Sequence, residues 1–170
     1  AKGKKDLLAA LHSATPEGLQ LSAAYQPQAL GLGHAVLCAR EILAAMPEGE
    51  EQTFAVMLPD DFIDAAAAAG HAGSAGCLAD MVALHEATGA WSLAVEEVPR
   101  EQTDKYGVVS LTSQATDAPE RMVAMVEKPK PADAPSNLAV VGRYVLPGAI
   151  FAALAEVKPG AGGEIQLTDG

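Results

Sequence analysis

Short apolar segments restrict the fold of this chain more than any other feature. Strands are predicted at Leu19–Tyr25, Phe54–Leu58, Trp91–Val98, Tyr106–Leu111, Met122–Val126 and Leu138–Leu146. Apolar residues at helical spacing predict helices at Lys4–Ala14, His34–Met46 and Leu78–Thr88, and a short one opened by Pro147 and running through Leu154. Since helices alternate with strands early and strands cluster later, we expect an α/β fold with a mixed β-sheet flanked by helices.

Two segments of this pattern allow a more specific prediction. Phe54–Leu58 is a continuous apolar run, which suits a strand that is covered on both faces. Asp64–Ala69 is an alanine-rich run that predicts a helix, with Asp64 as its N-cap and Gly70 as its stop. A low-complexity linker through Gly76 is the alternative.

Length and charge limit the class of protein. With 170 residues, of which 49% are hydrophobic, the chain is expected to form one domain with a substantial core. No apolar run approaches the length needed to cross a bilayer, and residues from Ala1 onward show no signal-peptide pattern, so we expect a cytoplasmic protein without a membrane partner. A net charge of −11 makes nucleic acid a poor partner. A small anionic substrate would need local lysines, helix N-termini and a divalent cation.

Cysteine and histidine positions do not predict a metal centre. Cys38 and Cys77 lie in predicted helices without C-x-x-C spacing, so neither a disulfide nor a zinc site is expected. The histidines lack metalloenzyme spacing, and solvated or helix-face roles are expected for all of them: His12, His34, His71 and His85.

An acid and a lysine stand side by side where Met122–Val126 runs out into a proline-rich loop. Because adjacent strand residues point to opposite faces, Glu127 and Lys128 can serve two different purposes at one strand end. A carboxylate accepts strong hydrogen bonds from sugar hydroxyls, and an ammonium group binds phosphate, so a sugar phosphate would satisfy both. A solvated salt bridge is the alternative.

Three further features follow predicted strands, where open α/β sheets bind ligands. Asp60 comes directly after Phe54–Leu58 and is a candidate magnesium ligand, although Asp60 and Asp61 could instead cap the following turn. Gln26–Gly33 joins a strand to a helix, and its glycines and glutamine amide suit the edge of a flat base. Gly107 would expose a backbone amide to a sugar hydroxyl, or it marks only a bend.

Six runs in this order, with matching gaps, resemble the bacterial UTP–glucose-1-phosphate uridylyltransferases from about Leu7 to Asp169. The runs are Gly31–Cys38, Phe54–Asp61, Tyr106–Val109, Val126–Pro129, Pro135–Leu146 and Pro159–Asp169. The resemblance implies a nucleotide-diphospho-sugar transferase fold of the glycosyltransferase-A type, incomplete at both ends, with residues 1–170 forming one partial domain. It also implies that UTP and glucose 1-phosphate react to give UDP-glucose and pyrophosphate by in-line displacement, without a covalent enzyme intermediate.

The same resemblance assigns roles residue by residue. Gln26 and Gly31 would contact the uracil, Gly107 and Glu127 would bind glucose hydroxyls, Lys128 would reach the sugar phosphate, Tyr144 would sit near the sugar-phosphate end, and Asp60 would ligate Mg²⁺. Lys128 and Asp60 would therefore be the catalytic residues and Mg²⁺ the cofactor. Because family members commonly self-associate, a homo-oligomer is also expected.

The sequence departs from the family pattern at two places. The glycine-rich G-G-x-G-T-R loop with its P-K pair, which grips the triphosphate, is not found, nor is the second metal-binding aspartate of a D-C-G-like motif. We therefore expect an excerpt of a longer enzyme, and we expect residues 1–170 alone to be inactive. The alternatives are a sugar-1-phosphate thymidylyl- or adenylyltransferase and a non-catalytic nucleotide-sugar-binding domain.

Overall fold

The computed structural model describes residues 2–14, 16–47, 52–64, 76–112, 121–160 and 163–170. The α-helices are α1 (Lys2–Ala14), α2 (Leu32–Cys38), α3 (Arg40–Ala44), α5 (Cys77–Thr88) and α6 (Ile150–Glu156). The strands are β1 (Thr53–Met57), β2 (Ser92–Glu97), β3 (Gly107–Leu111), β4 (Met122–Glu127) and β5 (Leu138–Pro147), and 3₁₀ turns form η2 (Arg100–Lys105) and η4 (Leu167–Asp169). Within these described ranges, no helix is long and apolar enough to span a bilayer.

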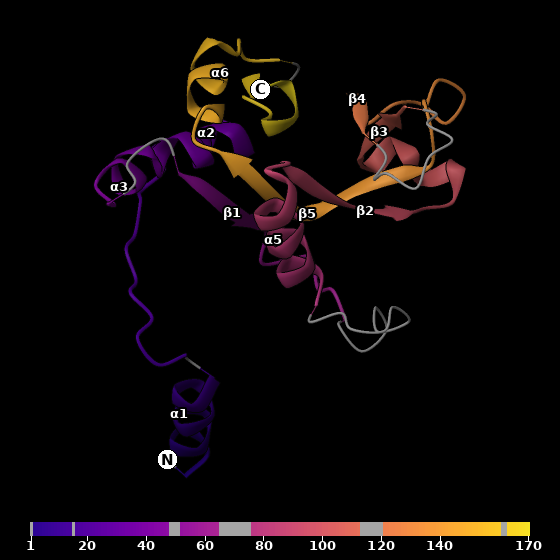
Figure 1. The fold of residues 1–170 in the computed structure, drawn as a ribbon. Coiled ribbons are helices and arrows are strands. Elements are labelled where there is room, and N and C mark those ends of the chain that lie inside the picture. Colours follow the sequence, from indigo (N-terminus) through magenta and orange to yellow (C-terminus); the bar gives the residue numbers. More distant parts are fainter. Residues whose placement is uncertain (1, 15, 48–51, 65–75, 113–120, 161–162) are drawn as a thin grey trace.

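The sheet is organised around the long strand β5 (Figure 1). Strand β2 pairs along one edge of β5, whereas β1 and β3 share the opposite edge. On that shared edge β1 pairs with the C-terminal half of β5 and β3 with its N-terminal half, and β4 lies outside β3. As a result, the last residue of β1 and the first residue of β3 converge on the middle of β5.

The sheet differs from the mixed one that was expected, because every pairing among the described strands is antiparallel. Strands β1 and β2 do run parallel to each other, since each is antiparallel to β5. They lie on opposite edges of β5 and exchange no hydrogen bonds, so they form no parallel pair. The expected α/β fold with helices flanking a sheet is otherwise confirmed.

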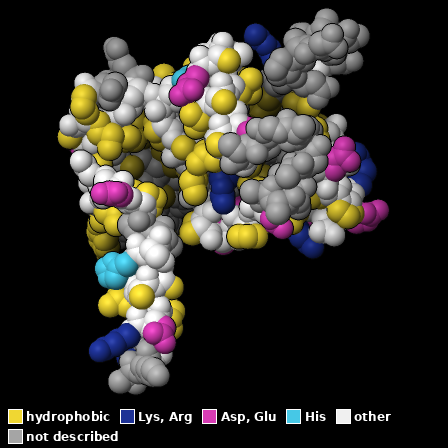
Figure 2. All heavy atoms as spheres, turned by 60° about the horizontal axis from the view of Figure 1, so that its bottom comes forward, with side chains coloured by type: hydrophobic (Ala, Val, Ile, Leu, Met, Phe, Trp, Pro, Cys, Tyr) yellow, Lys and Arg dark blue, Asp and Glu magenta, His cyan; other side chains and the backbone are white. Residues whose placement is uncertain are grey.

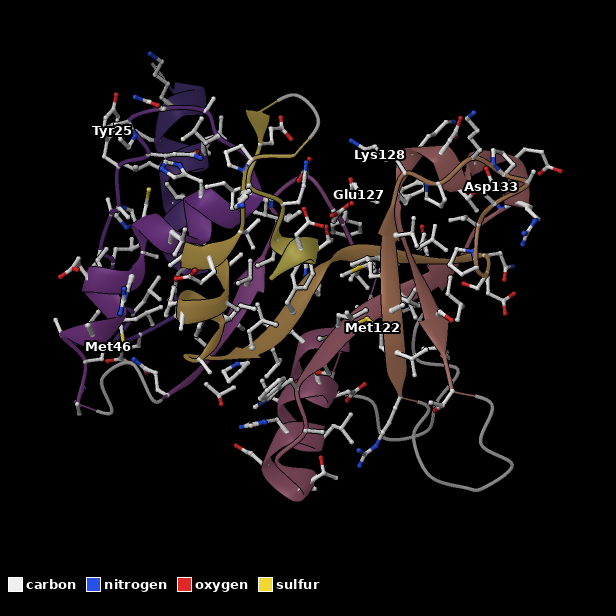
Figure 3. All side chains as sticks on the ribbon, turned by 90° about the horizontal axis from the view of Figure 1, so that it is seen from above. Tyr25, Met46, Met122, Glu127, Lys128 and Asp133 are labelled. Atoms are coloured by element: carbon white, nitrogen blue, oxygen red, sulfur yellow. The ribbon has the colours of Figure 1, made fainter. Side chains whose placement is uncertain are left out.

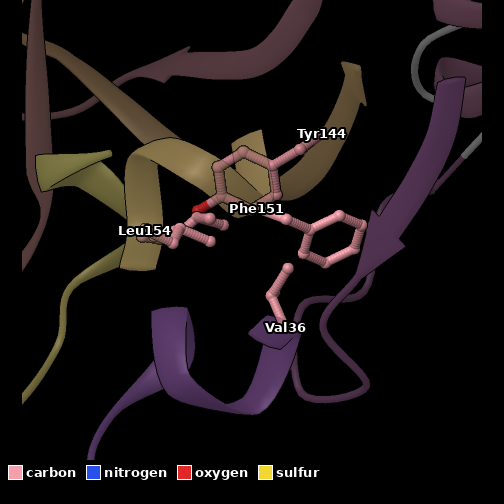
Figure 4. Close-up of a cluster of buried hydrophobic side chains, with 5 residues drawn as sticks. Val36, Tyr144, Phe151 and Leu154 are labelled. Carbon is pink, nitrogen blue, oxygen red and sulfur yellow. The ribbon is translucent and has the colours of Figure 1, made fainter. Parts of the chain in front are cut away.

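Helices cover the two faces of the sheet unequally (Figure 1). Helix α5 packs on β2 and β5, while α2 and α6 pack together on the other face. The main core lies on that second face and consists of Val36, Tyr144, Phe151, Leu154 and Leu167 (Figure 4). Phe151 and Leu154 are almost fully buried, and the Phe151 ring stacks on Phe54 of β1 with centroids 5.2 Å apart.

The predicted positions of most elements are confirmed, but two are not. Leu19–Tyr25 forms no strand: Leu21 and Tyr25 are 87% and 84% exposed, and no described strand lies beside the segment to share its hydrogen bonds. The helix predicted over His34–Met46 is split at Ala39, where i to i−3 hydrogen bonds tighten the turn. Ala39 thus ends α2 and precedes α3.

Strand β1 is covered on one face, not on both. Phe54 and Val56 face the core, whereas Ala55 and Met57 are exposed because α5 covers β2 and β5 instead. The alternatives for Asp64–Ala69, helix or linker, lie outside the described residues. Cys38 in α2 and Cys77 in α5 are free thiols.

Helix α1 projects from the body of the molecule (Figures 1 and 2). Its three leucines, Leu7, Leu8 and Leu11, share one side of the helix and are all exposed. Residues 16–30 connect α1 to α2 in a largely extended path that leads to the core. We call Gln26–Gly33, at the end of this path, the glycine loop.

Candidate functional site

The convergence of strand ends on β5 brings together five side chains or backbone positions that are far apart in the sequence. We call this group the strand-end cluster; it consists of Asp61, Gly107, Glu127, Tyr144 and Thr168. Glu127 and its neighbour Lys128 are seen at the end of β4 that approaches η4 (Figure 3). The cluster contains three of the predicted site residues and two that the sequence did not single out for binding.

Gly107 and Glu127 are direct partners in the β3–β4 ladder. A β-carbon built on Gly107 would lie 3.2 Å from Oε2 of Glu127, 3.5 Å from the sulfur of Met125 and 3.6 Å from the methyl carbon of Thr168. A side chain at this position would therefore press on the carboxylate. The absence of a side chain at Gly107 lets the Glu127 carboxylate lie close to the backbone of β3.

Lys128 does not continue the strand, contrary to the expected opposite-face arrangement. Its φ is +47°, and its amide donates to the carbonyl of Tyr106 at 2.9 Å. This left-handed turn swings the side chain back, so that Nζ lies 3.7 Å from Oε1 of Glu127. With 60% of the Lys128 side chain exposed, the pair itself adds little stability, and the ammonium remains accessible to an anion.

Tyr144 joins the cluster to the core. The residue is buried in β5 and packs with the core residues, while its phenol is electrostatically coupled to two carboxylates. Burial raises the pKa of Tyr144 above its ordinary value, and the negative charges of Glu127 and Asp61 raise it further. The phenol is therefore held in its protonated form, with a hydroxyl hydrogen to donate.

The two aspartates after β1 occupy different environments. Asp60 is exposed, whereas Asp61 is half-buried and its carboxylate packs against Gly142 so closely that a side chain there would collide with it. Arg143 fixes this turn: Nη1 donates to the carbonyl of Leu58 at 2.9 Å and Nη2 to that of Asp61 at 2.7 Å. The arginine thus holds both aspartates where β1 meets the centre of β5.

The glycine loop forms a second half of the site. Gly31 has a φ of +89° and precedes α2, and the Nε2 of Gln26 donates to its carbonyl at 3.1 Å. Gln26 Nε2 also lies 3.0 Å from Nδ1 of His34. The two predicted base-contacting residues, Gln26 and Gly31, are therefore in direct contact.

The C-terminal run connects the two halves. Ile165 donates its amide to the carbonyl of Leu30 at 2.7 Å and accepts from the amide of Gly33 at 2.9 Å. Three residues later, Thr168 packs its methyl group near Gly107. Residues 164–169 therefore bridge the glycine loop and the strand-end cluster.

Thr168 was not predicted as a site residue. Its Oγ1 is buried and has no hydrogen-bond partner among the described residues, an arrangement that is costly unless a ligand or water completes it. Asp61 was missed as well, apart from a possible role in capping a turn. Neither residue could be identified from the sequence pattern, because the turn after β1 brings Asp61 towards Tyr144 and the C-terminal run brings Thr168 to Gly107.

No ready-made metal cage is present in the part of the chain that the structure describes, where no three His, Cys, Asp or Glu side chains gather suitably. Asp60 nevertheless offers exposed carboxylate oxygens next to the strand-end cluster. Such a donor fits Mg²⁺, which keeps several waters and takes one or two protein carboxylates together with substrate phosphates.

Comparison with known proteins shows the family of the chain. A family model described as "Nucleotidyl transferase" matches residues 3–170. A UTP–glucose-1-phosphate uridylyltransferase from Komagataeibacter xylinus is 42% identical over 82% of this chain and 44% of its own length. The enzyme of the same name from Haemophilus influenzae is 39% identical over 98% of this chain and 54% of its own length. The chain thus spans about half the length of the curated relatives it matches.

Solved structures show the same likeness. The crystal structure of a UDP-glucose pyrophosphorylase complexed with UDP-glucose is 35% identical and superimposes with a TM-score of 0.81, over 98% of this chain and 58% of that one. A UDP-glucose pyrophosphorylase from Acinetobacter baumannii is 40% identical, with a TM-score of 0.74 over 99% of this chain and 53% of that one. The resemblance to uridylyltransferases is therefore confirmed, and the chain belongs to the nucleotidyl transferase family.

Proposed function

We propose that the protein carrying this chain is a UTP–glucose-1-phosphate uridylyltransferase, which forms UDP-glucose and pyrophosphate. The observation that carries the proposal is the end of the β3–β4 hairpin, where the Glu127 carboxylate lies against Gly107 with no side chain between it and the backbone, and the accessible ammonium of Lys128 lies beside it. An acceptor for hydroxyls next to a mobile cation suits a sugar phosphate. The names of the relatives supply the identity of both substrates.

The roles of the residues follow from this placement. Glu127 accepts hydrogen bonds from glucose hydroxyls, and Gly107 lets the sugar approach the backbone. Lys128 binds the sugar phosphate, and the protonated phenol of Tyr144 lies near the sugar-phosphate end of the site. Gln26 and Gly31 contact the uracil at the other half of the site. Residues 164–169 connect this half to the strand-end cluster.

The reaction is a single in-line displacement. An oxygen of the glucose 1-phosphate attacks the α-phosphorus of UTP, and the bond from that phosphorus to the bridging oxygen of the β-phosphate breaks as pyrophosphate leaves. Both substrates are anionic, so the chain contributes mainly by positioning them and by placing Lys128 against the developing charge. Mg²⁺ held by Asp60 would neutralise phosphate charge during the transfer.

Three broader attributes accompany the proposal. The protein acts in the cytoplasm, takes no nucleic acid or membrane partner, and self-associates. The net charge of −11 supports the exclusion of nucleic acid. Sedimentation analysis of the complete gene product tests the expected homo-oligomer.

The function is tested by measuring pyrophosphate release from the complete gene product against a matrix of nucleoside triphosphates and sugar 1-phosphates. UTP with glucose 1-phosphate is expected to give the highest kcat/KM. A preference for dTTP or ATP would assign the protein to a thymidylyl- or adenylyltransferase. Nucleotide-sugar binding without pyrophosphate release would leave a non-catalytic binding domain.

A further inference from the structure

His34 and Gln26 form a side-chain contact in which the donor atom and the acceptor atom can be identified. One amide atom of the Gln26 side chain lies 3.1 Å from the carbonyl oxygen of Gly31 and 3.0 Å from Nδ1 of His34. A backbone carbonyl only accepts hydrogen bonds, so the amide atom that faces it must be the nitrogen. This fixes the orientation of the Gln26 amide group.

The protonation state of His34 follows from that orientation. The Gln26 NH₂ group has two hydrogens, of which one points to Gly31 and the other to Nδ1 of His34. Nδ1 must therefore carry a lone pair, which makes the imidazole neutral with its proton on Nε2. Both donors of the Gln26 amide are then occupied, and no described residue donates to its Oε1.

His34 is itself well placed to hold this arrangement. It lies in the first turn of α2, directly after Gly33, whose amide is bonded to Ile165. The ring is half-buried, and the sulfur of Cys38, one helical turn later, lies 4.0 Å from both ring nitrogens. His34 therefore has the helix-face position expected from the sequence, and its contacts with Gln26 and Cys38 restrict the ring there.

We infer that His34 is a positioning residue that locks the Gln26 amide so that its oxygen faces the nucleotide base, and thereby selects bases with a donor at N3. Uracil and thymine carry an N3–H group, whereas N3 of cytosine is an acceptor and would face the Gln26 oxygen unfavourably. Without His34 only the Gly31 carbonyl holds the amide, so the half-turn that would present NH₂ to the base, which suits cytosine, is opposed by one hydrogen bond fewer. The inference rests on the proposed function in placing the base at Gln26.

Three variants separate this role from a structural one. His34→Leu removes the acceptor and puts an apolar side chain of similar size in its place. His34→Asn keeps an oxygen that can accept from Gln26. His85→Leu is the matched control, because His85 is also half-buried at a helix end, with its own backbone contact to Ala90, but lies on α5 away from the glycine loop.

The primary measurement is the binding of UTP and CTP to the complete gene product by calorimetry, without the sugar. The unaltered protein should prefer UTP, and His34→Leu should reduce the ratio of UTP to CTP affinity by about tenfold, the effect of one hydrogen bond. His34→Asn should retain most of the preference, and His85→Leu all of it. An unchanged ratio in His34→Leu, or equal loss of both nucleotides, would overturn the inference.

A second measurement needs no nucleotide. In ¹⁵N spectra of histidine-labelled protein at neutral pH, Nδ1 of His34 should show the shift of an unprotonated nitrogen, assigned by its disappearance in His34→Asn. A protonated Nδ1 would rule out the lock. If UTP is preferred in binding but glucose 1-phosphate is not a substrate, the proposed function fails while the role of His34 stands.

Discussion

The amide of Gly33 donates to the carbonyl of Ile165 at 2.9 Å, and this bond fastens the C-terminal run to the glycine loop. A β-carbon on Gly33 would lie 2.8 Å from the same carbonyl oxygen, closer than real β-carbons approach. The small residue is therefore required for the backbones to meet. Because Thr168 follows Ile165 by three residues, the bond also sets the distance between the two halves of the site.

Gly33→Ala is expected to destabilise the fold by about 1–3 kcal/mol, since backbone atoms must move to accept the methyl group. Gly3→Ala is the matched control: Gly3 is exposed in α1, and nothing lies within 4 Å of its β-carbon position. That change should be neutral or stabilise slightly, because alanine favours a helix. Urea unfolding of both variants measures the difference, and equal stability of the two would contradict the tight contact at Ile165.

Glu127→Gln should weaken glucose 1-phosphate selectively and leave UTP binding almost unchanged. Replacing a charged acceptor by a neutral one costs about 1.5–3 kcal/mol for a hydrogen bond, which corresponds to roughly ten- to a hundredfold in kcat/KM for the sugar. Glu97→Gln, at the exposed end of β2, is the control and should have no effect. Steady-state kinetics with each substrate varied in turn checks the prediction, and unchanged kinetics for the sugar phosphate would refute the role of Glu127.

The local elements of this fold were predictable from sequence, while the relationships between them were not. Helix α5 ends at Gly89, which adopts the left-handed conformation that its position after a periodic apolar segment predicts. Leu19–Tyr25 has the composition of a strand, yet a strand exists only where a neighbour supplies hydrogen bonds, and sequence does not report neighbours. The same limit explains the all-antiparallel sheet.

The site shows this limit as well. Gly107 and Glu127 were found from strand ends and residue chemistry, and the register of β3 with β4 places them together. Asp61 and Thr168 were missed because β5 and the C-terminal run bring them in from distant segments. The left-handed turn at Lys128 could not be predicted either, because positive φ is uncommon for lysine and nothing in the sequence indicates it.

Tyr144 should make the fold less stable at alkaline pH. Its pKa is raised in the folded protein relative to the unfolded chain, where the pKa of a tyrosine is about 10. The stabilisation is therefore fully present below the unfolded pKa and is lost as the pH rises through the folded pKa. Unfolding titrations above about pH 10 should show a steeper loss for the unaltered protein than for Tyr144→Phe.

The cause of that shift can be tested separately. Glu127→Gln removes one of the two negative charges that act on the phenol, so the pKa of Tyr144 should fall towards its ordinary value while remaining raised by burial. Ultraviolet titration of tyrosinate, with Tyr144→Phe used to identify the signal, measures the change. A pKa of Tyr144 that is the same with and without the Glu127 charge would show that the two groups are not coupled.

Asp60→Asn is expected to abolish uridylyl transfer at ordinary magnesium concentrations without altering stability. Asp60 is exposed, so the substitution removes a charge without disturbing the core, whereas its loss as a metal ligand would leave phosphate charge unneutralised. Asp133→Asn, at an exposed site between β4 and β5 (Figure 3), is the control and should retain activity. Asp61→Asn should be milder than Asp60→Asn in turnover, because Asp61 packs against Gly142. The initial rate of each of the three variants, measured against magnesium concentration, tests the assignment of the metal to Asp60. Equal losses at Asp60 and Asp61, or an unchanged magnesium requirement in Asp60→Asn, would assign the metal elsewhere.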